Sequence, residues 1–318
     1  MDSVSVTFYI FFDSFTMSLL SMIKMTFVRM ERGTKRLAVM EMKMKNVCVI
    51  TGGGSGIGLA AAKYMPKEKC IVLAGRTVRK LENAVSELKK IGYEAYAHAC
   101  DTSNRGSVRE LVDYVASLGE IRNVINAAGM SPAMASPEQL LRVNAMGTVY
   151  VNQEFSGHMQ SGSVIVDVSS NSAYVLPGFL VSKRIYRLAE ADEEQFIRKL
   201  LKRSSLPRGD YQRAGFAYAM SKNFVVWYAA KCAFDYGKKG IRVVSLSPGL
   251  IATDMGNLEA KEGGELIRYA AEERMGTPEE LGFALATVAD ERNGYLAGVD
   301  ILCDGGSTNG KRNKQFVK

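Results

Sequence analysis

Short runs rich in β-branched residues alternate with longer segments of helical periodicity, and this alternation constrains the fold more than any other feature. The runs are residues 46–50, 70–74, 94–99, 123–126, 163–168, 241–246 and 298–303. Between them, residues 81–92 and 107–119 carry apolar residues at helical spacing. Such an alternation predicts a parallel sheet covered by helices on both faces. Because the chain has no internal repeat and no Pro/Gly-rich linker, we expect a single doubly wound α/β domain with a parallel seven-stranded sheet.

The two ends of the chain differ from this alternating body. Residues 1–44 hold eight of the sixteen methionines, and their apolar stretch, residues 4–23, has Asp13 inside it and neither a basic segment before it nor a cleavage site after it. Two interpretations stay open: a non-native or disordered start, with the true beginning at a methionine just before residue 45, or a tether to a membrane. Residues 311–318 form a basic tail, so the domain is predicted to span residues 45–310.

The formal net charge of +8 resides mainly in these two ends. Residues 1–45 contribute +3 and residues 311–318 contribute +4, so the body is nearly neutral and gives no support to a nucleic-acid groove. The five cysteines form no CxxC pair, and the chain has only two histidines, so we expect no metal site. We interpret the cysteines as buried thiols in a reducing compartment, the cytoplasm.

A glycine-rich loop, TGGGSGIG, follows the first predicted strand directly. Glycines in this pattern permit a tight turn, close approach of the backbone to a pyrophosphate and tight packing of the next helix, whose free N–H groups point at the anion. The strand, loop and helix together indicate a dinucleotide site. We expect contacts from Thr51, Gly52, Gly54, Ser55, Gly56, Ile57 and Gly58.

The end of the second predicted strand indicates which dinucleotide binds. An NAD-binding chain usually has an acidic residue there to accept hydrogen bonds from the ribose 2′-hydroxyl, whereas this chain has Gly75 and Arg76. A guanidinium can hold a 2′-phosphate with two hydrogen bonds, so NADP is favoured over NAD. The alternative is that Arg76 is a solvated arginine in a loop. Asp101, after the third strand, is placed to accept a hydrogen bond from the adenine amino group.

A tyrosine and a lysine four residues apart, Tyr218 and Lys222, open a long apolar helix predicted after the fifth strand. The spacing places both side chains on one helix face. A phenol has a pKa of about 10, and an ammonium group one turn away favours the phenolate and lowers that pKa toward the working range. We therefore expect an acid–base pair at this position.

These motifs, in this order, resemble those of the short-chain dehydrogenase/reductase family. The resemblance extends over about residues 45–307 and rests on TGGGSGIG at 51–58, Asp101, NAAG at 126–129, VNAMG at 143–147, VSS at 168–170, YAMSK at 218–222, SPGLIAT at 247–253 and DGG at 304–306. It implies a Rossmann fold and hydride transfer between the nicotinamide and a substrate carbon, for which the protein supplies orientation and proton transfer.

The resemblance implies catalytic roles for Asn144, Ser170, Tyr218 and Lys222. Tyr218 would donate a proton to a carbonyl oxygen or remove it from an alcohol, and Ser170 would hydrogen-bond the same oxygen. Lys222 would hold the nicotinamide ribose and tune Tyr218, and Asn144 would carry a water that links Lys222 to solvent.

Cofactor contacts outside the glycine-rich loop are implied in the same way. Asn126, Ala127 and Gly129 would line the ribose, although Asn126 is equally explained as an amide that joins neighbouring strands. Thr253 would reach the nicotinamide carboxamide. Besides Tyr218 and Lys222, further contacts are expected at Thr102, Ala128, Pro248, Gly249 and Ile251.

The chain departs from the common family pattern between Ser170 and Tyr218, which lie 48 positions apart. The extra residues, about 176–213, include an amphipathic helical segment, and the connection before Asn144 is short, a combination that resembles the bacterial 3α-hydroxysteroid dehydrogenase/carbonyl reductases. The insertion either covers a wide apolar substrate or lies beside the Tyr218 helix and blocks the interface through which many family members assemble. Another lid is predicted at 250–275, with candidate wall residues Met255, Leu258, Leu266 and Ile267.

The resemblance thus implies an NADP(H)-dependent oxidoreductase that interconverts a secondary alcohol and a ketone. A hydroxysteroid or bile acid, reacting at position 3, is the favoured substrate. Two alternatives stay open, a general carbonyl or 3-oxoacyl thioester reductase and an NADP-binding regulatory protein without turnover. We expect a small apolar, steroid-like substrate, a homo-oligomer (dimer or tetramer), and no nucleic-acid or membrane partner.

Overall fold

The computed structural model describes residues 27–31, 34–38 and 44–314, and the chain divides into two compact units, residues 1–44 and 45–318. In the first unit, the described residues form an antiparallel pair, β1 (Phe27–Glu31) and β2 (Thr34–Ala38). The predictions made for the apolar stretch and for the start of the chain lie outside the described residues. Among the residues searched, none of the helices is both long and apolar enough to cross a membrane.

The second unit is built on a seven-stranded sheet in which every pair of neighbouring strands is parallel. The strands are β3 (Asn46–Thr51), β4 (Cys70–Gly75), β5 (Glu94–Ala99), β6 (Glu120–Asn126), β7 (Val164–Val168), β8 (Arg242–Pro248) and β9 (Asp300–Cys303). Their spatial order is β5-β4-β3-β6-β7-β8-β9. Each predicted run therefore forms a strand, and the prediction of a parallel seven-stranded sheet is confirmed.

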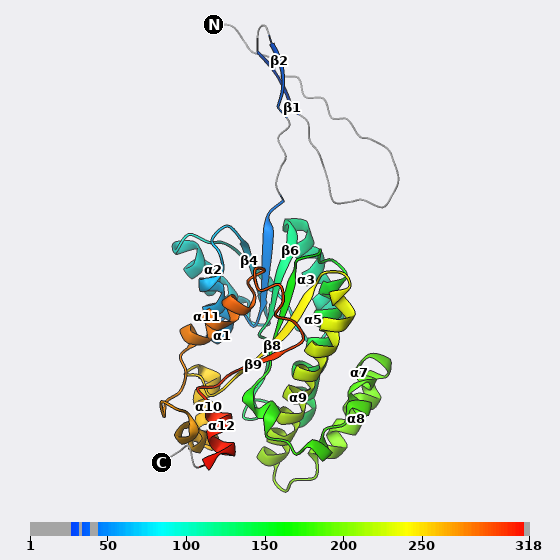
Figure 1. Ribbon diagram of the computed structural model, residues 1–318, viewed down its shortest axis with the longest axis vertical. Helices are drawn as coiled ribbons and strands as arrows, with labels where there is room; N and C mark the ends of the chain where they lie inside the picture. Colours follow the sequence, from blue (N-terminus) through cyan, green and yellow to red (C-terminus); the bar gives the residue numbers. More distant parts are fainter. Residues whose placement is uncertain (1–26, 32–33, 39–43, 315–318) are drawn as a thin grey trace. The chain divides into compact units, whose positions relative to one another are not determined.

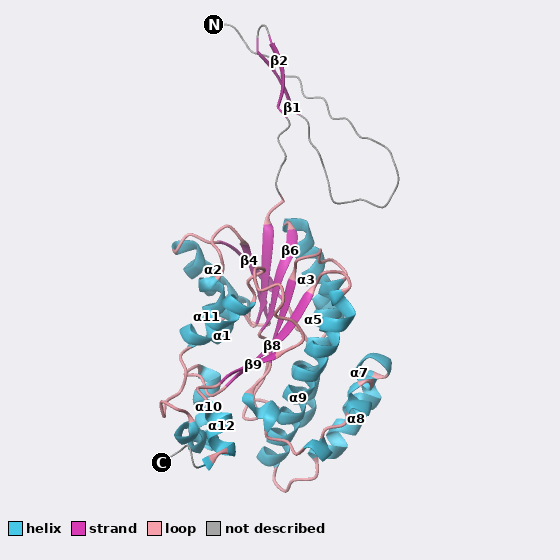
Figure 2. Cartoon of the chain, in the orientation of Figure 1, coloured by secondary structure: helices cyan, strands magenta, loops and turns pink. Residues whose placement is uncertain are grey.

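Helices cover both faces of this sheet (Figures 1 and 2). One face carries α1 (Gly56–Tyr64), α2 (Val78–Lys90) and α11 (Pro278–Val288), and the other carries α3 (Arg105–Leu118), α5 (Gly147–Ser156) and α9 (Asp210–Gly237). Alternate residues of β3 enter the two cores, Val47 and Val49 on the α3 side, Cys48 and Ile50 on the α1 side. Burial on both faces explains why the strands are continuously apolar. The single doubly wound Rossmann domain is thus confirmed.

The order of the strands reverses between β3 and β6, and this reversal places the ligand-binding crevice. From β3 the chain passes to β4 and β5 on one side, and later to β6 and the remaining strands on the other. Thr51, the last residue of β3, pairs with Ala74 of β4 and with Asn126 of β6. The loops that follow these strands diverge, so a crevice opens between them at the carboxyl edge of the sheet.

Shorter elements follow the strands at this edge. They are α4 (Pro137–Leu140), the π-helix η1 (Leu141–Met146), the 3₁₀ helix η2 (Asn171–Tyr174), α10 (Asp254–Gly263), the 3₁₀ helix η4 (Gly264–Tyr269) and α12 (Ser307–Arg312). The predicted lid, residues 250–275, thus contains α10 and η4. Residues 315–318 of the predicted basic tail lie outside the described residues.

The helix with Tyr218 is longer than the sequence predicts. It was expected to open at Tyr218, but α9 begins at Asp210, so Tyr218 lies more than two turns inside it. The added turns are stabilised by packing, because Ala214 and Tyr218 form a buried cluster with Leu140 of α4. Residues 210–213, assigned to the insertion from sequence, therefore belong to α9 in the structure.

The insertion folds against the outer side of α9. It forms the 3₁₀ helix η3 (Gly178–Leu180), α6 (Lys183–Tyr186), α7 (Leu188–Ala191) and α8 (Glu193–Ser204). The ring of Phe196 packs at a tilt against that of Phe224, with centroids 4.9 Å apart, and the ring centroids of Tyr186 and Trp227 are 5.5 Å apart. Of the two positions left open by the sequence, the structure shows the one beside the Tyr218 helix. The amphipathic face predicted from Ile185, Leu188, Phe196, Leu200 and Leu201 is the packed face.

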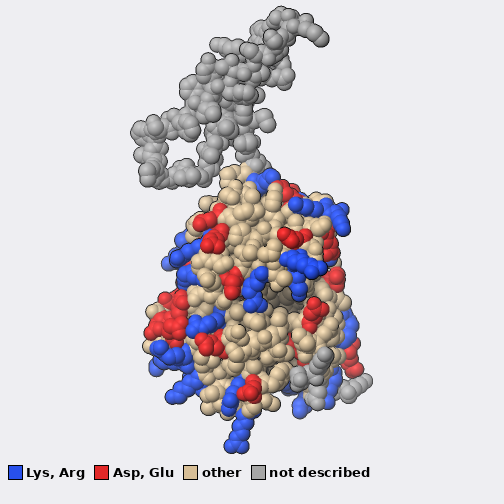
Figure 3. Space-filling model, turned by 180° about the vertical axis from the view of Figure 1, so that it is seen from behind, with Lys and Arg blue, Asp and Glu red and all other residues tan. Residues whose placement is uncertain are grey.

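The cysteines and the surface charges agree with the composition of the body. Cys48, Cys70, Cys100 and Cys232 are buried and Cys303 is partly buried, and all are free thiols. Burial raises the pKa of Cys48 and of Cys232 to about 12, so these thiols stay protonated. On the face shown in Figure 3, basic and acidic side chains are mixed.

Replacing Phe196 with Ala tests how strongly the insertion is bound to the domain. Its side chain is fully buried, so we expect Phe196→Ala to lower the free energy of unfolding by about 3–5 kcal/mol, measured by urea denaturation. Phe234→Ala is the control, because Phe234 is 80% exposed on α9 and its loss should change stability by less than about 0.5 kcal/mol. Equal effects of the two substitutions would show that α8 is not anchored through Phe196.

Candidate active site

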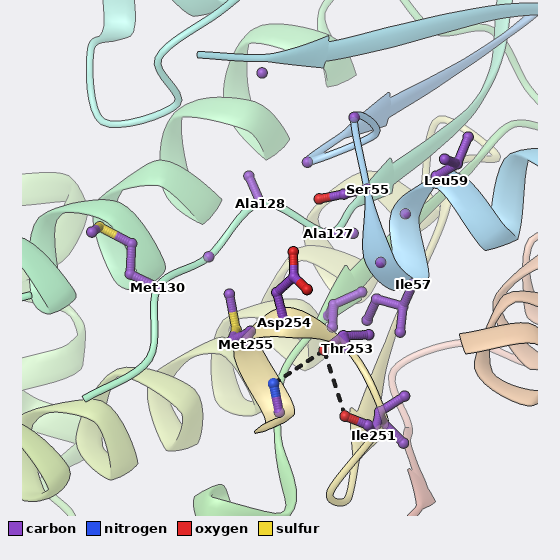
Figure 4. Close-up of a pocket in the computed structure, with 18 of the residues that line it drawn as sticks. Ser55, Ile57, Leu59, Ala127, Ala128, Met130, Ile251, Thr253, Asp254 and Met255 are labelled. Carbon is purple, nitrogen blue, oxygen red and sulfur yellow. Dashed lines mark hydrogen bonds between the residues drawn. The ribbon is translucent and has the colours of Figure 1, made fainter. Parts of the chain in front are cut away.

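A cavity of about 560 Å³ opens at the carboxyl edge of the sheet. Its walls come from the loops after β3, β4, β5, β6, β7 and β8 and from the helices α9 and α10. Figure 4 shows the loop after β3 and the start of α1 facing Ala127 and Ala128 on one side and α10 on another. The cavity therefore lies where the order of the strands reverses.

The cavity collects most of the residues predicted from sequence. They are Gly52, Gly54, Ser55, Gly56, Ile57, Gly58, Arg76, Asp101, Thr102, Ala127, Ala128, Gly129, Ser170, Tyr218, Lys222, Pro248, Gly249, Ile251 and Thr253. Three predicted residues, Thr51, Asn126 and Asn144, do not line it and are buried directly behind the lining. Thr51 and Asn144 hydrogen-bond the loop that contains Ala128 and Met130, and Asn126 links Thr51 to Asp167.

The glycine-rich loop leaves no room for a side chain at Gly52 or Gly58. A Cβ at Gly58 would lie 2.6 Å from the Gly52 carbonyl oxygen, and a Cβ at Gly52 would lie 2.8 Å from the Ala127 carbonyl oxygen. Gly52 and Gly56 also have positive φ angles, +66° and +58°, which L side chains rarely adopt. Ser55 precedes α1 without a side-chain cap, so the first N–H groups of the helix stay available to an anion. The loop fits a dinucleotide pyrophosphate.

Basic side chains surround the end of β4. Arg76 follows the strand directly and is exposed, and no carboxylate occupies its position. Lys80 of α2 lies beside the glycine-rich loop, since a Cβ at Gly54 would be 3.2 Å from its Cβ. Lys63 of α1 lines the cavity as well. Neither lysine was singled out from the sequence, because lysines at these positions look like ordinary exposed residues of amphipathic helices.

Asp101 is held by its own loop. Its Oδ1 accepts hydrogen bonds from the Ser103 N–H (2.9 Å) and the Ser103 hydroxyl (2.7 Å). The Asp101 backbone N–H donates to the Ser107 hydroxyl of α3. Asp101 and Thr102 both line the cavity, so the predicted position for an adenine contact is open to a ligand.

The side chains of Ser170, Tyr218 and Lys222 meet at the other end of the lining. The Ser170 hydroxyl lies close enough to the Tyr218 phenol to lower its pKa. The Lys222 Nζ donates to the Val168 carbonyl oxygen at 3.0 Å and lies 5.8 Å from the centroid of the Tyr218 ring. Ser170 comes from the end of β7 and the other two from one face of α9, so the predicted juxtaposition is present.

The ionisation of this group differs from the sequence expectation. Burial, followed by the nearby Glu259 carboxylate, raises the pKa of Tyr218, and the Ser170 hydroxyl lowers it. Burial lowers the pKa of Lys222 to about 8, although the carboxylates of Glu259 and Asp167 act to raise it. The sequence predicted a lowered pKa for Tyr218. In the structure the desolvation of the phenol is the larger effect.

Asn144 braces the loop in front of Lys222. Its Oδ1 accepts from the Met130 N–H at 2.9 Å, and its Nδ2 donates to the Met130 carbonyl oxygen at 3.0 Å. Gly129 fits between the two side chains, because a Cβ there would lie 3.2 Å from the Asn144 Oδ1 and 3.5 Å from the Lys222 Nζ. The π-helical turn of residues 141–146 therefore places Asn144 next to Lys222.

A buried carboxylate, Asp167 of β7, lies behind the reaction centre. Asn126 donates to its Oδ1 at 3.1 Å and Asn152 donates to its Oδ2 at 2.7 Å. Burial raises the pKa of Asp167 to about 6, although both amides and Lys222 favour its ionised form. Asp167 was not among the residues predicted from the sequence. The available signal was an acid inside the otherwise apolar strand VIVDV.

The wall opposite the glycine-rich loop is formed by α10. Thr253 caps this helix, accepting a hydrogen bond from the Gly256 N–H at 3.1 Å, and Asp254 and Met255 follow it into the cavity (Figure 4). Glu259, one turn after Met255, also lines the cavity and was missed. Of the predicted wall residues only Met255 lines it, whereas Leu258, Leu266 and Ile267 do not.

Two family models together match almost the whole second unit, and known proteins are similar to it. A family model described as short chain dehydrogenase matches residues 46–182, and one described as Enoyl-(Acyl carrier protein) reductase matches residues 179–308. A short-chain dehydrogenase/reductase, bsc3, of Alternaria brassicicola is 28% identical, covering 83% of this chain and 96% of that protein. The 3beta-hydroxysteroid dehydrogenase 2 of Eggerthella lenta is 29% identical, covering 81% of this chain and 93% of that protein.

Solved structures share the fold. A short chain dehydrogenase from Burkholderia cenocepacia in complex with NADP superposes with a TM-score of 0.64 and 21% identity, covering 84% of this chain and 98% of that one. At this level of identity the likeness establishes the arrangement of the sheet and helices.

Replacing Gly58 with Ala tests the glycine-rich loop. The added methyl group would overlap the Gly52 carbonyl oxygen, and relieving the overlap must move the loop away from α1. Overpacking of this kind costs about 1–3 kcal/mol, so we expect the affinity for NADPH, measured by fluorescence titration, to fall by about 10-fold to 100-fold. Gly237→Ala is the control, because a Cβ there meets nothing within 4 Å. Unchanged NADPH affinity in a folded Gly58→Ala variant would contradict the proposed phosphate site.

Proposed function

The chain belongs to the short-chain dehydrogenase/reductase family, oxidoreductases that act on alcohols and ketones, and we propose that it uses NADP(H) to interconvert a secondary alcohol and a ketone. The observation that carries the proposal is the shared cavity. Ser170, Tyr218 and Lys222 line the same space as the glycine-rich loop, so a dinucleotide bound on that loop and a substrate at Tyr218 would be adjacent. A regulatory protein without turnover would have no need of this arrangement.

The proton-transfer chemistry is assigned to three side chains. Tyr218 donates its phenolic proton to the carbonyl oxygen during reduction and takes a proton from the alcohol during oxidation. Ser170 hydrogen-bonds the same oxygen and so orients it. The Lys222 ammonium lies within 6 Å of the phenol ring and favours the phenolate that forms when the proton leaves. When bound, NADP(H) supplies or accepts the hydride.

The remaining assigned residues position these groups and the cofactor. Asn144 holds the loop before Lys222 through its two hydrogen bonds to Met130. Thr51 and Asn126 hold the Ala127–Gly129 segment from behind, which supports the strand-joining interpretation of Asn126. Thr253, Pro248, Gly249 and Ile251 would surround the nicotinamide end.

The preference for NADP rests on the residues after β4. Arg76 occupies the position at which an acidic residue would bind the ribose hydroxyls of NAD. Lys80 lies beside the glycine-rich loop. Two cationic side chains complement a 2′-phosphate and would give a plain ribose no comparable contact. The Burkholderia cenocepacia structure, which contains NADP, agrees with this proposal.

The proposed substrate class is a hydroxysteroid or bile acid, with position 3 favoured. Its support is the Eggerthella lenta relative, whose name specifies a 3beta-hydroxysteroid, together with the insertion before the catalytic tyrosine. None of the insertion residues described by the structure lines the cavity, so the substrate wall would be formed by α10 and by Met130 and Met134. Because α8 covers the aromatic side of α9, a homo-oligomer would assemble through another surface.

The reaction is tested with Tyr218→Phe, which removes the transferable proton and keeps the ring. We expect turnover of a panel of oxo bile acids, simple ketones and 3-oxoacyl thioesters to fall by about 10²-fold to 10⁴-fold, with NADPH affinity nearly unchanged. Tyr295→Phe, at a fully exposed tyrosine, is the control. Retained turnover in Tyr218→Phe would refute the role of Tyr218, and no oxidation of NADPH by any member of the panel would refute the enzymatic function.

The choice of cofactor is tested with Arg76→Asp. Loss of a charged hydrogen bond costs about 1.5–3 kcal/mol, so kcat/KM for NADP(H) should fall by about 10-fold to 100-fold while the value for NAD(H) rises or stays constant. Arg79→Asp is the matched control, since Arg79 is an exposed arginine of α2 that does not line the cavity. A wild-type enzyme with a higher kcat/KM for NAD than for NADP would overturn the assignment.

A further inference from the structure

The Glu259 carboxylate lines the cavity, and the described part of the chain offers its buried oxygen no hydrogen-bond partner. The Oε1 atom of Glu259 is buried, and neither oxygen of this side chain makes a hydrogen bond or ion pair with the residues that the structure describes. Burial raises the pKa of Glu259, and the nearby Lys222 ammonium lowers it. An unpaired buried carboxylate is costly, so its retention in a ligand cavity calls for a partner that the ligand brings.

The position of Glu259 places it on the substrate side of the cavity. Met255 and Glu259 are one turn apart on α10 and both line the cavity, so they share the inward face of this helix. The charge of Glu259 acts on both Tyr218 and Lys222 and raises the pKa of each. The carboxylate therefore lies near the group that exchanges a proton with the substrate.

The negative charge of Glu259 also opposes the proposed proton transfer from Tyr218. It disfavours the Tyr218 phenolate, which must form when the tyrosine gives its proton to a carbonyl oxygen. A hydrogen-bond donor on the substrate would satisfy the carboxylate and reduce this opposition. A substrate that lacks such a donor would leave the carboxylate desolvated and unpaired. The site would therefore bind that substrate much more weakly than one with the donor.

We propose that Glu259 is a specificity-determining residue that accepts a hydrogen bond from a second polar group of the substrate, a hydroxyl or an ammonium group near the reacting carbon. The inference rests on the proposed function and narrows its substrate class. The substrate is an alcohol or ketone that carries its own hydrogen-bond donor, and a polyhydroxylated ring satisfies this requirement whereas a simple mono-alcohol does not.

The test compares matched cyclic substrates with and without the donor. The probes are cyclohexanol, the cyclohexane-1,2-, 1,3- and 1,4-diols and the corresponding aminocyclohexanols, each oxidised with NADP. In the wild-type enzyme the best donor-bearing probe should have a kcat/KM at least about 10-fold above that of cyclohexanol. Glu259→Leu should remove this preference, and Asn257→Leu, an exposed residue of the same helix that does not line the cavity, should keep it.

A further variant separates hydroxyl from ammonium recognition. Glu259→Gln keeps an acceptor oxygen and removes the charge. If the natural donor is a hydroxyl, the variant keeps most of the preference for the diols. If the donor is cationic, the preference for the aminocyclohexanols falls by about 10-fold or more.

Binding measurements keep this inference distinct from the proposed catalytic role. The affinities of the same probes for the NADP complexes of Tyr218→Phe and of the double variant Tyr218→Phe/Glu259→Leu are measured by calorimetry. Loss of turnover with a retained binding preference supports both proposals, and retained turnover in Tyr218→Phe refutes only the catalytic one. The Glu259 proposal is overturned if the wild type binds no probe, if the ratios are equal with and without the carboxylate, or if Glu259→Leu weakens only NADP binding.

Discussion

The hydroxyl group of Thr51 joins the two halves of the cavity. It donates to the Asn126 Oδ1 at 2.7 Å and accepts from the Ala128 N–H at 3.1 Å. Because Thr51 ends the central strand and begins the glycine-rich loop, this one side chain ties that loop to the segment after β6. Asn126 in turn donates to Asp167 of β7. The carboxyl ends of three adjacent strands are thus held in register, and the crevice between their loops keeps its shape.

The same buried network reaches the reaction centre from behind. Asp167 and Glu259 both place negative charge near Lys222, and both favour the ammonium form that burial disfavours. Glu259 also raises the pKa of Tyr218, so its charge helps one member of the pair and hinders the other. The pKa of Tyr218 during the reaction therefore depends on the charged and hydrogen-bonding groups that the substrate and the cofactor place in the cavity. The electrostatic environment that favours proton transfer is therefore complete only when both the substrate and the cofactor are bound.

Local sequence patterns were sufficient to predict the structure where a residue type has a single structural role. Glycines without room for a Cβ and strands buried on both faces leave a direct signal, so the sheet and the phosphate loop were predictable. Ser170 and Asn144 needed the family resemblance, because a serine or an asparagine has many roles. Glu259 gave no signal, since a glutamate on a mixed helix looks solvated until the helix is known to face a cavity. Similarly, the start of α9 at Asp210 depends on tertiary contacts with α4.

The location of the insertion determines which elements can select the substrate. Phe196 packs α8 on α9 and Tyr186 packs α6 on α9, and both are fully or almost fully buried, so they have no surface left for a ligand. Selectivity must therefore come from the segments that line the cavity near Tyr218, which are α10 and the loop with Met130 and Met134. The methionines can adapt to different apolar shapes. A fixed carboxylate cannot adapt in this way, so Glu259 imposes the stricter requirement on what binds.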